Sequence, residues 1–222
     1  MENIQLPLFI SCELAEETGW HIGDGSMNFY NNKGVKKGLY QLRGHRINDK
    51  NLYLKRIKPF FKKLYNINIS LRDMPSTEVF GFQIWSNKLV NFKKALGLQL
   101  GKKTTIKIPQ LFFKKKKFMI AVIRGIFDTD GCVYLLRKNK KLYPILEIHT
   151  ISMRLAKQMR SIFKLLGFTA TEYVYYPKKG NRLPCSGITI RGVKQFHRFM
   201  RIIKPQNENH VKKYEFYANL YK

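Results

Sequence analysis

Hydrophobic positions along the chain switch between helical and strand-like spacing, and the order of these switches occurs twice. In the first half, hydrophobic residues three and four apart predict helices from about Ser11 to Gly23, after Asn48 and from Ser86 to Leu98. Pro59 is expected to kink or split the second of these helices. Stretches rich in β-branched and aromatic residues predict strands at residues 26–32, 39–44, 67–72 and 79–85. The first half therefore has the predicted order αββαββα.

The same order returns in the second half. A helix is predicted from about Lys114 to Asp130, and a second one starts after Ser152 and stops at Gly167. Strands are predicted at 132–137, 142–149, 169–176 and 186–191, and further helices at 193–203 and 209–221. We therefore predict an α+β chain of two pseudo-symmetric αββαββα repeats, residues 1–100 and 114–222, joined by a linker at 101–113.

Small residues recur at every fourth position in the first helix of each repeat, and both series end next to an Asp-Gly pair. The two series are Ala15, Gly19, Gly23, Asp24-Gly25 and Ala121, Gly125, Thr129, Asp130-Gly131. Four-residue spacing places the small residues on one helical face, which allows two helix backbones to pack closely. Gly25 and Gly131 are predicted helix terminators. We expect the two helices to form the interface between the repeats and the two aspartates to meet there.

Two carboxylates at two helix C-termini are electrostatically unfavourable, because each helix end already carries partial negative charge. A divalent cation would resolve the conflict, since Mg²⁺ binds carboxylate and carbonyl oxygens and completes its shell with water and phosphate. The alternative is that each Asp-Gly pair simply opens a turn. The occurrence of two copies, each with the small-residue series, favours a metal site at Asp24 and Asp130.

The charge of the chain points to a polyanionic partner. The 222 residues include 42 Lys and Arg against 14 Asp and Glu, a net charge of +28, while 44% of residues are hydrophobic, as in a folded protein. Nucleic acid is the expected partner. An anionic membrane is less favoured, because the sequence has no run of eighteen apolar residues, and Met1 to Ile10 lacks the features of a signal peptide.

The three cysteines, Cys12, Cys132 and Cys185, are widely spaced and form no zinc or disulfide pattern. A reducing, intracellular location is therefore expected, such as a prokaryotic cytoplasm or an organelle.

The paired motifs and the order of elements resemble the LAGLIDADG homing endonucleases in their single-chain, two-repeat form. Ile-Arg-Gly-Ile-Phe-Asp-Thr-Asp-Gly131 is similar to the second motif of that family, and Glu17 to Gly25, with its terminal Gly-Asp-Gly, is a weaker match to the first. Further similar segments are Gly44-His45, Ile108-Pro109, Ile148 to Leu155 and Leu165 to Phe168.

The resemblance implies a saddle of two four-stranded antiparallel sheets over the major groove of a long, asymmetric DNA site. It implies a monomeric, site-specific endonuclease that makes a staggered double-strand break. Asp24 and Asp130 would hold Mg²⁺, with help from the carbonyls of Gly23 and Thr129, and Mn²⁺ or Ca²⁺ could occupy the same sites. Asp128 has Ile22 at the corresponding place in the first motif, so we expect a helix-end or interface role for it.

Two lysines and two histidines are further candidates. Lys107 and Lys204 hold comparable places at the ends of the repeats, where the family often has a basic residue at the edge of the active site. The alternative is that they are ordinary surface lysines. His45 and His149 are expected to contact phosphate or support the structure rather than act as general bases, and His21 is expected to be packed inside.

DNA contacts are expected from one face of the strands, because every second side chain points toward the groove. The candidates are Asn28, Tyr30, Gln41, Arg43, Arg72, Gln83, Tyr134, Arg137, Glu147, Tyr173, Tyr175, Thr189 and Arg191. Strand register decides which of them face DNA.

Two other functions share these features. The fold could serve an intron RNA maturase, or a DNA-binding regulator that no longer cuts. Retention of both aspartates argues against a regulator without catalysis, but it does not separate a nuclease from a nuclease that also binds RNA. A basic ribosome-associated protein would explain the charge but not the duplicated motif.

Overall fold

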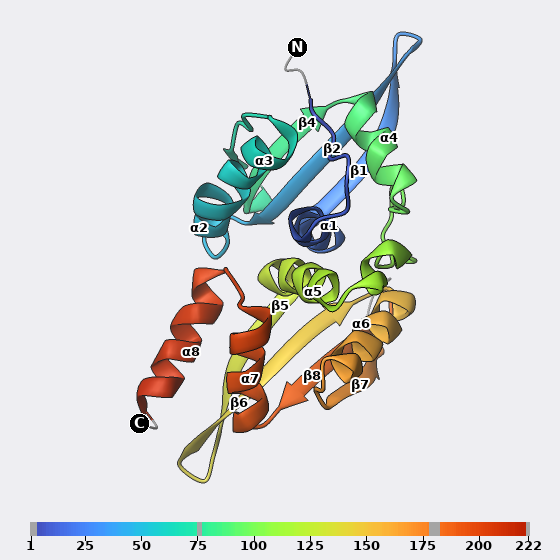
Figure 1. The fold of residues 1–222 in the computed structure, drawn as a ribbon. Helices are drawn as coiled ribbons and strands as arrows, with labels where there is room; N and C mark the ends of the chain where they lie inside the picture. The colour runs from blue at the N-terminus through green and yellow to red at the C-terminus, as the bar shows by residue number, and fades with distance from the viewer. Residues whose placement is uncertain (1–3, 75–76, 178–182, 221–222) are drawn as a thin grey trace.

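Two repeats, each a four-stranded antiparallel sheet with helices against one face, make up the computed structural model, which describes residues 4–74, 77–177 and 183–220 (Figure 1). The first repeat contains α1 (Cys12–Asp24), β1 (Gly25–Asn32), β2 (Val35–His45), α2 (Lys50–Leu52), η1 (Tyr53–Ile57), α3 (Lys58–Tyr65), β3 (Arg72–Met74), β4 (Val79–Trp85) and α4 (Asn87–Ala95). The second contains η3 (Gln110–Lys114), α5 (Lys116–Asp130), β5 (Gly131–Lys138), β6 (Lys141–Thr150), α6 (Met153–Leu165), β7 (Ala170–Tyr175), β8 (Cys185–Arg191), α7 (Val193–Ile203) and α8 (Glu208–Leu220).

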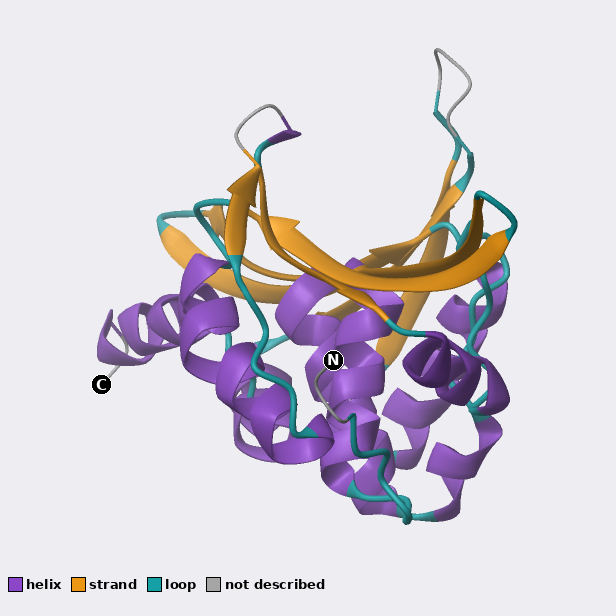
Figure 2. Ribbon diagram, turned by 90° about the horizontal axis from the view of Figure 1, so that it is seen from above, coloured by secondary structure: helices purple, strands orange, loops and turns teal. Residues whose placement is uncertain are grey.

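The strand orders are equivalent, β1-β2-β4-β3 and β5-β6-β8-β7. Viewed from above, the two sheets form one concave surface, and the helices cover the opposite, convex side (Figure 2). The α+β fold of two antiparallel four-stranded sheets, predicted from the sequence and from its family resemblance, is therefore confirmed.

The two motif helices α1 and α5 pack side by side between the sheets (Figure 1). Their backbones approach most closely at Gly19 and Gly125. A Cβ atom added to Gly19 would lie 2.8 Å from the Cα of Gly125, and one added to Gly125 would lie 2.9 Å from the Cα of Gly19. Real Cβ contacts are not this short, so the small-residue face that the sequence shows is required for this packing.

Gly25 and Gly131 end these helices by a different mechanism from the one expected. Both residues have extended backbone, with φ of −83° and −79°, rather than the left-handed conformation of a common helix terminator. Glycine is needed at both positions because there is no room for a side chain. A Cβ on Gly25 would lie 2.6 Å from the carbonyl oxygen of His21, and a Cβ on Gly131 would lie 2.5 Å from the ring of Phe127. The chain can therefore pass directly from helix into strand.

Other differences are local. Residues 67–71 are not a strand, and β3 begins only at Arg72, with Ile67 and Ile69 buried before it. Pro59 does not break its helix. The preceding turn widens into the π-helical segment η1, and Pro59 lies in the first turn of α3, where a missing N–H is tolerated. The predicted turns at 73–76 and 177–182 fall partly outside the described residues.

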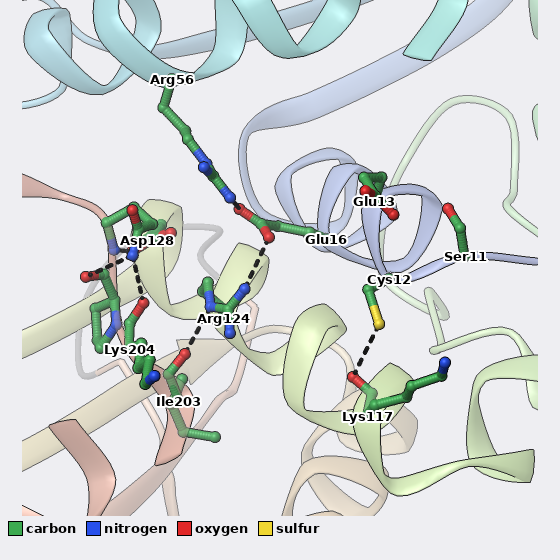
Figure 3. Close-up of polar contacts among 12 residues, drawn as sticks. Ser11, Cys12, Glu13, Glu16, Arg56, Lys117, Arg124, Asp128, Ile203 and Lys204 are labelled. Carbon is green, nitrogen blue, oxygen red and sulfur yellow. Dashed lines mark hydrogen bonds and ion pairs between the residues drawn. The ribbon is translucent and has the colours of Figure 1, made fainter. Parts of the chain in front are cut away.

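Buried ion pairs tie the repeats together. Glu16 on α1 accepts hydrogen bonds from Arg56 at 2.9 Å and from Arg124 of α5 at 3.0 Å, and Arg124 also donates to the carbonyl of Ile203 at 2.6 Å (Figure 3). One carboxylate thus links both repeats.

The next residue, Glu17, is fully buried and accepts from Lys93, Tyr40 and Tyr65 within the first repeat.

Cys12, Cys132 and Cys185 are all free. Of the helices in the described part of the chain, none combines the length and apolar character that crossing a membrane requires.

Candidate active site and nucleic-acid interface

The two motif aspartates lie at the adjoining C-terminal ends of α1 and α5. A Cβ on Gly23, the residue before Asp24, would lie 3.3 Å from the carboxyl carbon of Asp130. The Asp130 carboxyl of the second repeat is therefore packed against the end of the first motif helix. Asp24 is partly buried and accepts a 2.9 Å hydrogen bond from the hydroxyl of Tyr53, whereas Asp130 is exposed. The close packing of the helices brings together the residues that the sequence singled out.

Both carboxyls have raised pKa values. Desolvation raises the pKa of Asp24 well above its ordinary value, and the negative charges of Asp130 and Asp49 add to the effect. The pKa of Asp130 is raised to about 6, mainly because neighbouring protein atoms displace water, while the charge of Lys103 opposes the shift. Loss of contact with water makes the largest contribution to both shifts, and the negative charge of Asp49 adds to each.

Lys103 supplies a positive charge that acts on both carboxyls. Its ammonium group donates hydrogen bonds to the carbonyl of Ile22, at 3.0 Å, and to the carbonyl of Gly23. Burial lowers the pKa of Lys103, and the charges of Asp130 and Asp24 act in the opposite direction. Lys103 belongs to the predicted linker and was not among the predicted site residues. The linker is held here because the N–H of Gly101 bonds to the carbonyl of Met27 at 2.9 Å.

The placement of Lys107 and Lys204 at the edge of the active site stays a prediction. Both side chains are exposed, and neither forms an ion pair with any residue that the structure describes. Lys204 lines a surface groove between α7 and α8 together with Arg201 and Tyr214. The lysine whose charge acts on both aspartates is Lys103.

Asn207 occupies in the second repeat the place that Lys103 has in the first. Its amide nitrogen donates to the carbonyl of Asp128 at 2.9 Å, two residues before Asp130, just as Lys103 donates to the carbonyl two residues before Asp24. The same amide also donates to Asp49 at 2.9 Å. The two halves of the site therefore differ, with a cation in one and a neutral amide beside a carboxylate in the other.

Asp128 is directed to the start of the last helix. It is fully buried, and one carboxyl oxygen accepts from the backbone N–H groups of Gln206 at 2.7 Å and Asn207 at 3.1 Å, just before α8. Burial raises the pKa of Asp128 to about 7. This contact fixes the segment that carries Asn207.

The candidate histidines have separate environments. The Nδ1 atom of His45 accepts from the backbone N–H groups of Ile47 and Asn48, both at 3.2 Å, which stabilises the turn before α2. His149 faces the concave surface and pairs with Glu147 at 3.1 Å. His21 is buried and stacks on Tyr40, and burial keeps its pKa well below the ordinary value.

The donor set suits a hard divalent cation. Two carboxylates adjoin carbonyls at the ends of two helices, and a positively charged group, the Lys103 ammonium, already binds two of these carbonyls. Within the described ranges, no cluster of three or more His, Cys, Asp or Glu side chains has metal-binding geometry. A metal held at Asp24 and Asp130 would therefore need oxygen ligands from carbonyls, water or a bound phosphate.

Strand register places the predicted DNA contacts of the first repeat on one face. Met27, Tyr40 and Phe82 point into the core, so the alternate positions of the same strands face the concave surface. These concave positions include Asn28, Tyr30, Gln41, Arg43, Arg72 and Gln83. Trp85 belongs to the same face, is exposed and contacts Tyr30 with ring centroids 6.0 Å apart, although it was not predicted.

In the second repeat all but one of the predicted contacts share the concave face. The concave set is Tyr134, Glu147, Tyr173, Tyr175, Thr189 and Arg191. Arg137 pairs with Leu142 and lies on the same face as the buried Val133, so the register directs it toward the convex, helix-covered side. Tyr134 and Arg137 are three positions apart in one strand, so they cannot share a face.

Comparison with known families gives a match to part of the chain. Residues 117–204 match the model of the LAGLIDADG-like domain. A segment of 103 residues is 30% identical to the ATP-dependent DNA helicase Hel308 of Methanocaldococcus jannaschii, which corresponds to 42% of this chain and only 8% of the helicase.

Solved structures share the whole fold at low sequence identity. Mesophilic variants of the homing endonuclease I-DmoI superpose with a TM-score of 0.63 and 15% identity over 86% of this chain and 94% of theirs. The LAGLIDADG meganuclease I-AabMI bound to uncleaved DNA gives a TM-score of 0.59 and 10% identity over 95% of this chain and 91% of its own. The LAGLIDADG homing endonuclease I-GzeII in complex with its DNA target gives a TM-score of 0.59 and 12% identity over 95% of this chain and 89% of its own.

Proposed function

We propose that this chain, which has the two-repeat fold of the LAGLIDADG homing endonucleases and a LAGLIDADG-like domain at residues 117–204, is a site-specific endonuclease for double-stranded DNA. The observation that carries the proposal is the meeting of Asp24 and Asp130 at the junction of the two sheets, in a protein with a net charge of +28. A strongly basic protein suits a DNA duplex, and two acidic groups at the junction of its sheets are unfavourable for binding unless they serve chemistry.

The proposed substrate is a long, asymmetric DNA site bound by a single chain. Both motifs are present in one polypeptide, so one molecule supplies both halves of the site. The concave strand positions of the two repeats carry different side chains, which predicts a target whose two halves differ in sequence.

Asp24 and Asp130 are proposed to hold Mg²⁺. Solved structures of I-DmoI include complexes with DNA and Ca and with DNA and Mn, and a variant of it in complex with its target DNA in the presence of Mg. A bound divalent cation would neutralise charge on the scissile phosphate and lower the pKa of an attacking water. The aspartates bind and orient this ion and must be ionised to do so.

Lys103 and Tyr53 are proposed to complete the site. The charge of the Lys103 ammonium acts on both carboxylates, and it can stabilise negative charge that develops on a phosphate oxygen. The Tyr53 hydroxyl fixes one oxygen of Asp24 through its 2.9 Å hydrogen bond, which leaves the other oxygen available. Tyr53 is therefore proposed as a positioning residue.

The two aspartates occupy pseudo-equivalent positions, so each is proposed to serve one DNA strand, which gives a staggered double-strand break. The environments of the two aspartates are unequal. The carbonyl two residues before Asp24 binds the cation Lys103, whereas the carbonyl two residues before Asp130 binds the neutral amide of Asn207. Unequal cutting rates for the two strands follow from this difference.

The proposal is tested by selection of cleaved molecules from a library of randomised DNA duplexes with purified protein and Mg²⁺. The expected result is recovery of one related set of sequences cut on both strands at fixed positions. Recovery of no cleaved sequence, together with retained DNA binding, would indicate a regulator without catalysis and contradict the proposal.

A further inference from the structure

Gln41 and Glu147 occupy equivalent positions in the two sheets but differ in charge. Each lies in the central part of its concave face, Gln41 on β2 and Glu147 on β6, and each is the same number of residues beyond its motif aspartate. Gln41 pairs with Gln83 across to β4, and Glu147 pairs with Thr189 across to β8. The two repeats therefore present different chemistry to the same part of a bound duplex.

The surroundings of Gln41 are rich in hydrogen-bond donors. Its carbonyl oxygen accepts from the amide of Gln83 at 3.0 Å and from Arg43, and its own amide donates to the hydroxyl of Ser26 at 2.6 Å. Arg72 extends the network by donating to Gln83. Arg and Gln side chains of this kind suit the acceptor edges of guanine and adenine in the major groove.

Glu147 is held by two neighbours in its own sheet, Tyr173 on β7 and His149 on β6. One carboxyl oxygen accepts from the hydroxyl of Tyr173 at 2.6 Å, and the other pairs with Nε2 of His149 at 3.1 Å. Its side chain is 12% exposed. The ring of Tyr173 lies directly over Gly187, where a Cβ would be 2.6 Å from the tyrosine hydroxyl, so the position of this ring depends on glycine.

A carboxylate at this position is unfavourable for DNA binding in general, because the concave surface is expected to face phosphates, which are also negatively charged. Among the described strand positions that point to the concave side, Glu147 is the only carboxylate. An ionised carboxylate accepts about four hydrogen bonds, and the protein supplies two, so acceptor capacity remains for a ligand.

We propose that Glu147 recognises the 4-amino group of a cytosine in the half of the target that lies on the second repeat, and that Gln41 and Arg43 read a purine at the equivalent place in the other half. This inference rests on the proposed DNA-binding function. In the major groove, cytosine presents an amino donor, whereas guanine presents only acceptors, which a carboxylate repels. Adenine also has an amino group, but its neighbouring N7 is an acceptor, so cytosine is the better match.

The alternative is that Glu147 only holds Tyr173 and His149 in place. A structural role of that kind would change affinity for all sequences equally, because it involves no particular base. If Glu147 instead contacts a base, its substitution changes the sequence preference at one base pair. The two roles are therefore separable by sequence-resolved binding.

The experiment is selection of bound duplexes from a randomised library in EDTA, so that no cleavage occurs, with the wild type, Glu147→Gln and the matched control Gln41→Glu. The wild type should select a C·G pair at one position, which Glu147→Gln should change toward A·T, as expected for a glutamine. Gln41→Glu should change the preference only at the corresponding place in the other half. An unchanged site in Glu147→Gln would overturn the proposal.

A second measurement uses the wild-type protein and therefore does not depend on a folded variant. Each cytosine of the selected site is replaced in turn by the 2-pyrimidinone deoxynucleoside, which is cytosine without its 4-amino group. One of these replacements should weaken binding to the wild type by about tenfold. No sensitive cytosine would overturn the proposal. Failure of the wild type to bind any duplex would instead contradict the proposed DNA-binding function.

Discussion

Lys103 donates a 3.0 Å hydrogen bond from its ammonium group to the carbonyl oxygen of Ile22, two residues before Asp24. This contact attaches the segment between the repeats to the end of the first motif helix. It places a positive charge where the carbonyls of a helix C-terminus and two carboxylates concentrate negative charge. The relationship supports a direct part for Lys103 in the proposed chemistry.

Lys103→Met should slow cleavage by about 100-fold, because it removes a fixed cation that stabilises charge near the scissile phosphate. DNA affinity should fall only slightly, since many other lysines contribute to phosphate binding. The measurement is the single-turnover cleavage rate at saturating protein. Lys107→Met serves as the matched control and should cleave at nearly the wild-type rate, because Lys107 is exposed and unpaired within the described structure. Equal rates for wild type and Lys103→Met would exclude this role.

Wild-type protein should accumulate a nicked intermediate, because Asn207 cannot supply the charge that Lys103 supplies. Asn207→Lys should speed the slower strand and reduce the intermediate. Plasmid cleavage with strand-specific labels measures both rates. Asn207→Ala is the control, since it removes the bonds to Asp128 and Asp49 without adding charge. If both strands are cut at one rate in the wild type, the two halves do not differ in the way described.

Stability should depend on pH through Asp130. Its folded pKa is about 6, above the unfolded value of ~3.9, so the folded protein binds more protons between these values. This contribution to stability is present at low pH and is lost as the pH rises through about 6. Asp130→Asn should therefore raise the melting temperature relative to wild type at pH 8 more than at pH 5. The difference between the two proteins isolates Asp130 from Asp128, whose pKa is about 7.

Added Mg²⁺ should reverse that loss of stability at pH 8. A cation that binds the folded protein alone raises the melting temperature, and its binding requires ionised carboxylates. The wild type should respond to Mg²⁺ at pH 8 and much less at pH 5, while Asp130→Asn should respond weakly at both. A response that does not depend on pH or on Asp130 would place the ion elsewhere.

Gly19→Ala should destabilise the protein by about 2 kcal/mol or more, because the new Cβ would force the two motif helices apart. The added atom would lie 2.8 Å from the Cα of Gly125 in the present packing. Chemical denaturation measures the change, and Lys116→Ala at an exposed position of α5 is the control, expected within about 0.5 kcal/mol of wild type. A stability equal to wild type would mean that the helices can separate without cost.

The sequence predicts those parts of the fold that follow from local periodicity. The small-residue faces and the motif aspartates lie in regular helices, so their spacing alone predicts that the two helices pack through these faces and that the aspartates meet. Alternation predicts most of the concave residues once one buried position is known, and it also shows why Arg137 cannot join Tyr134. Lys103 and Asn207 lie outside regular elements. Their positions depend on long-range contacts, such as the hydrogen bond of Gly101 to Met27 and that of Gln206 to Asp128, which leave no periodic signal.

Cleavage of the selected target by Asp24→Asn and Asp130→Asn tests the central claim most directly. Each variant keeps the size of the side chain and removes its negative charge, so binding measured in EDTA should remain within a few-fold of wild type. With Mg²⁺, neither variant should produce a double-strand break under conditions in which the wild type cuts to completion. Double-strand cleavage near the wild-type rate by either variant would contradict the assignment of Asp24 and Asp130 as the metal-binding residues of this site.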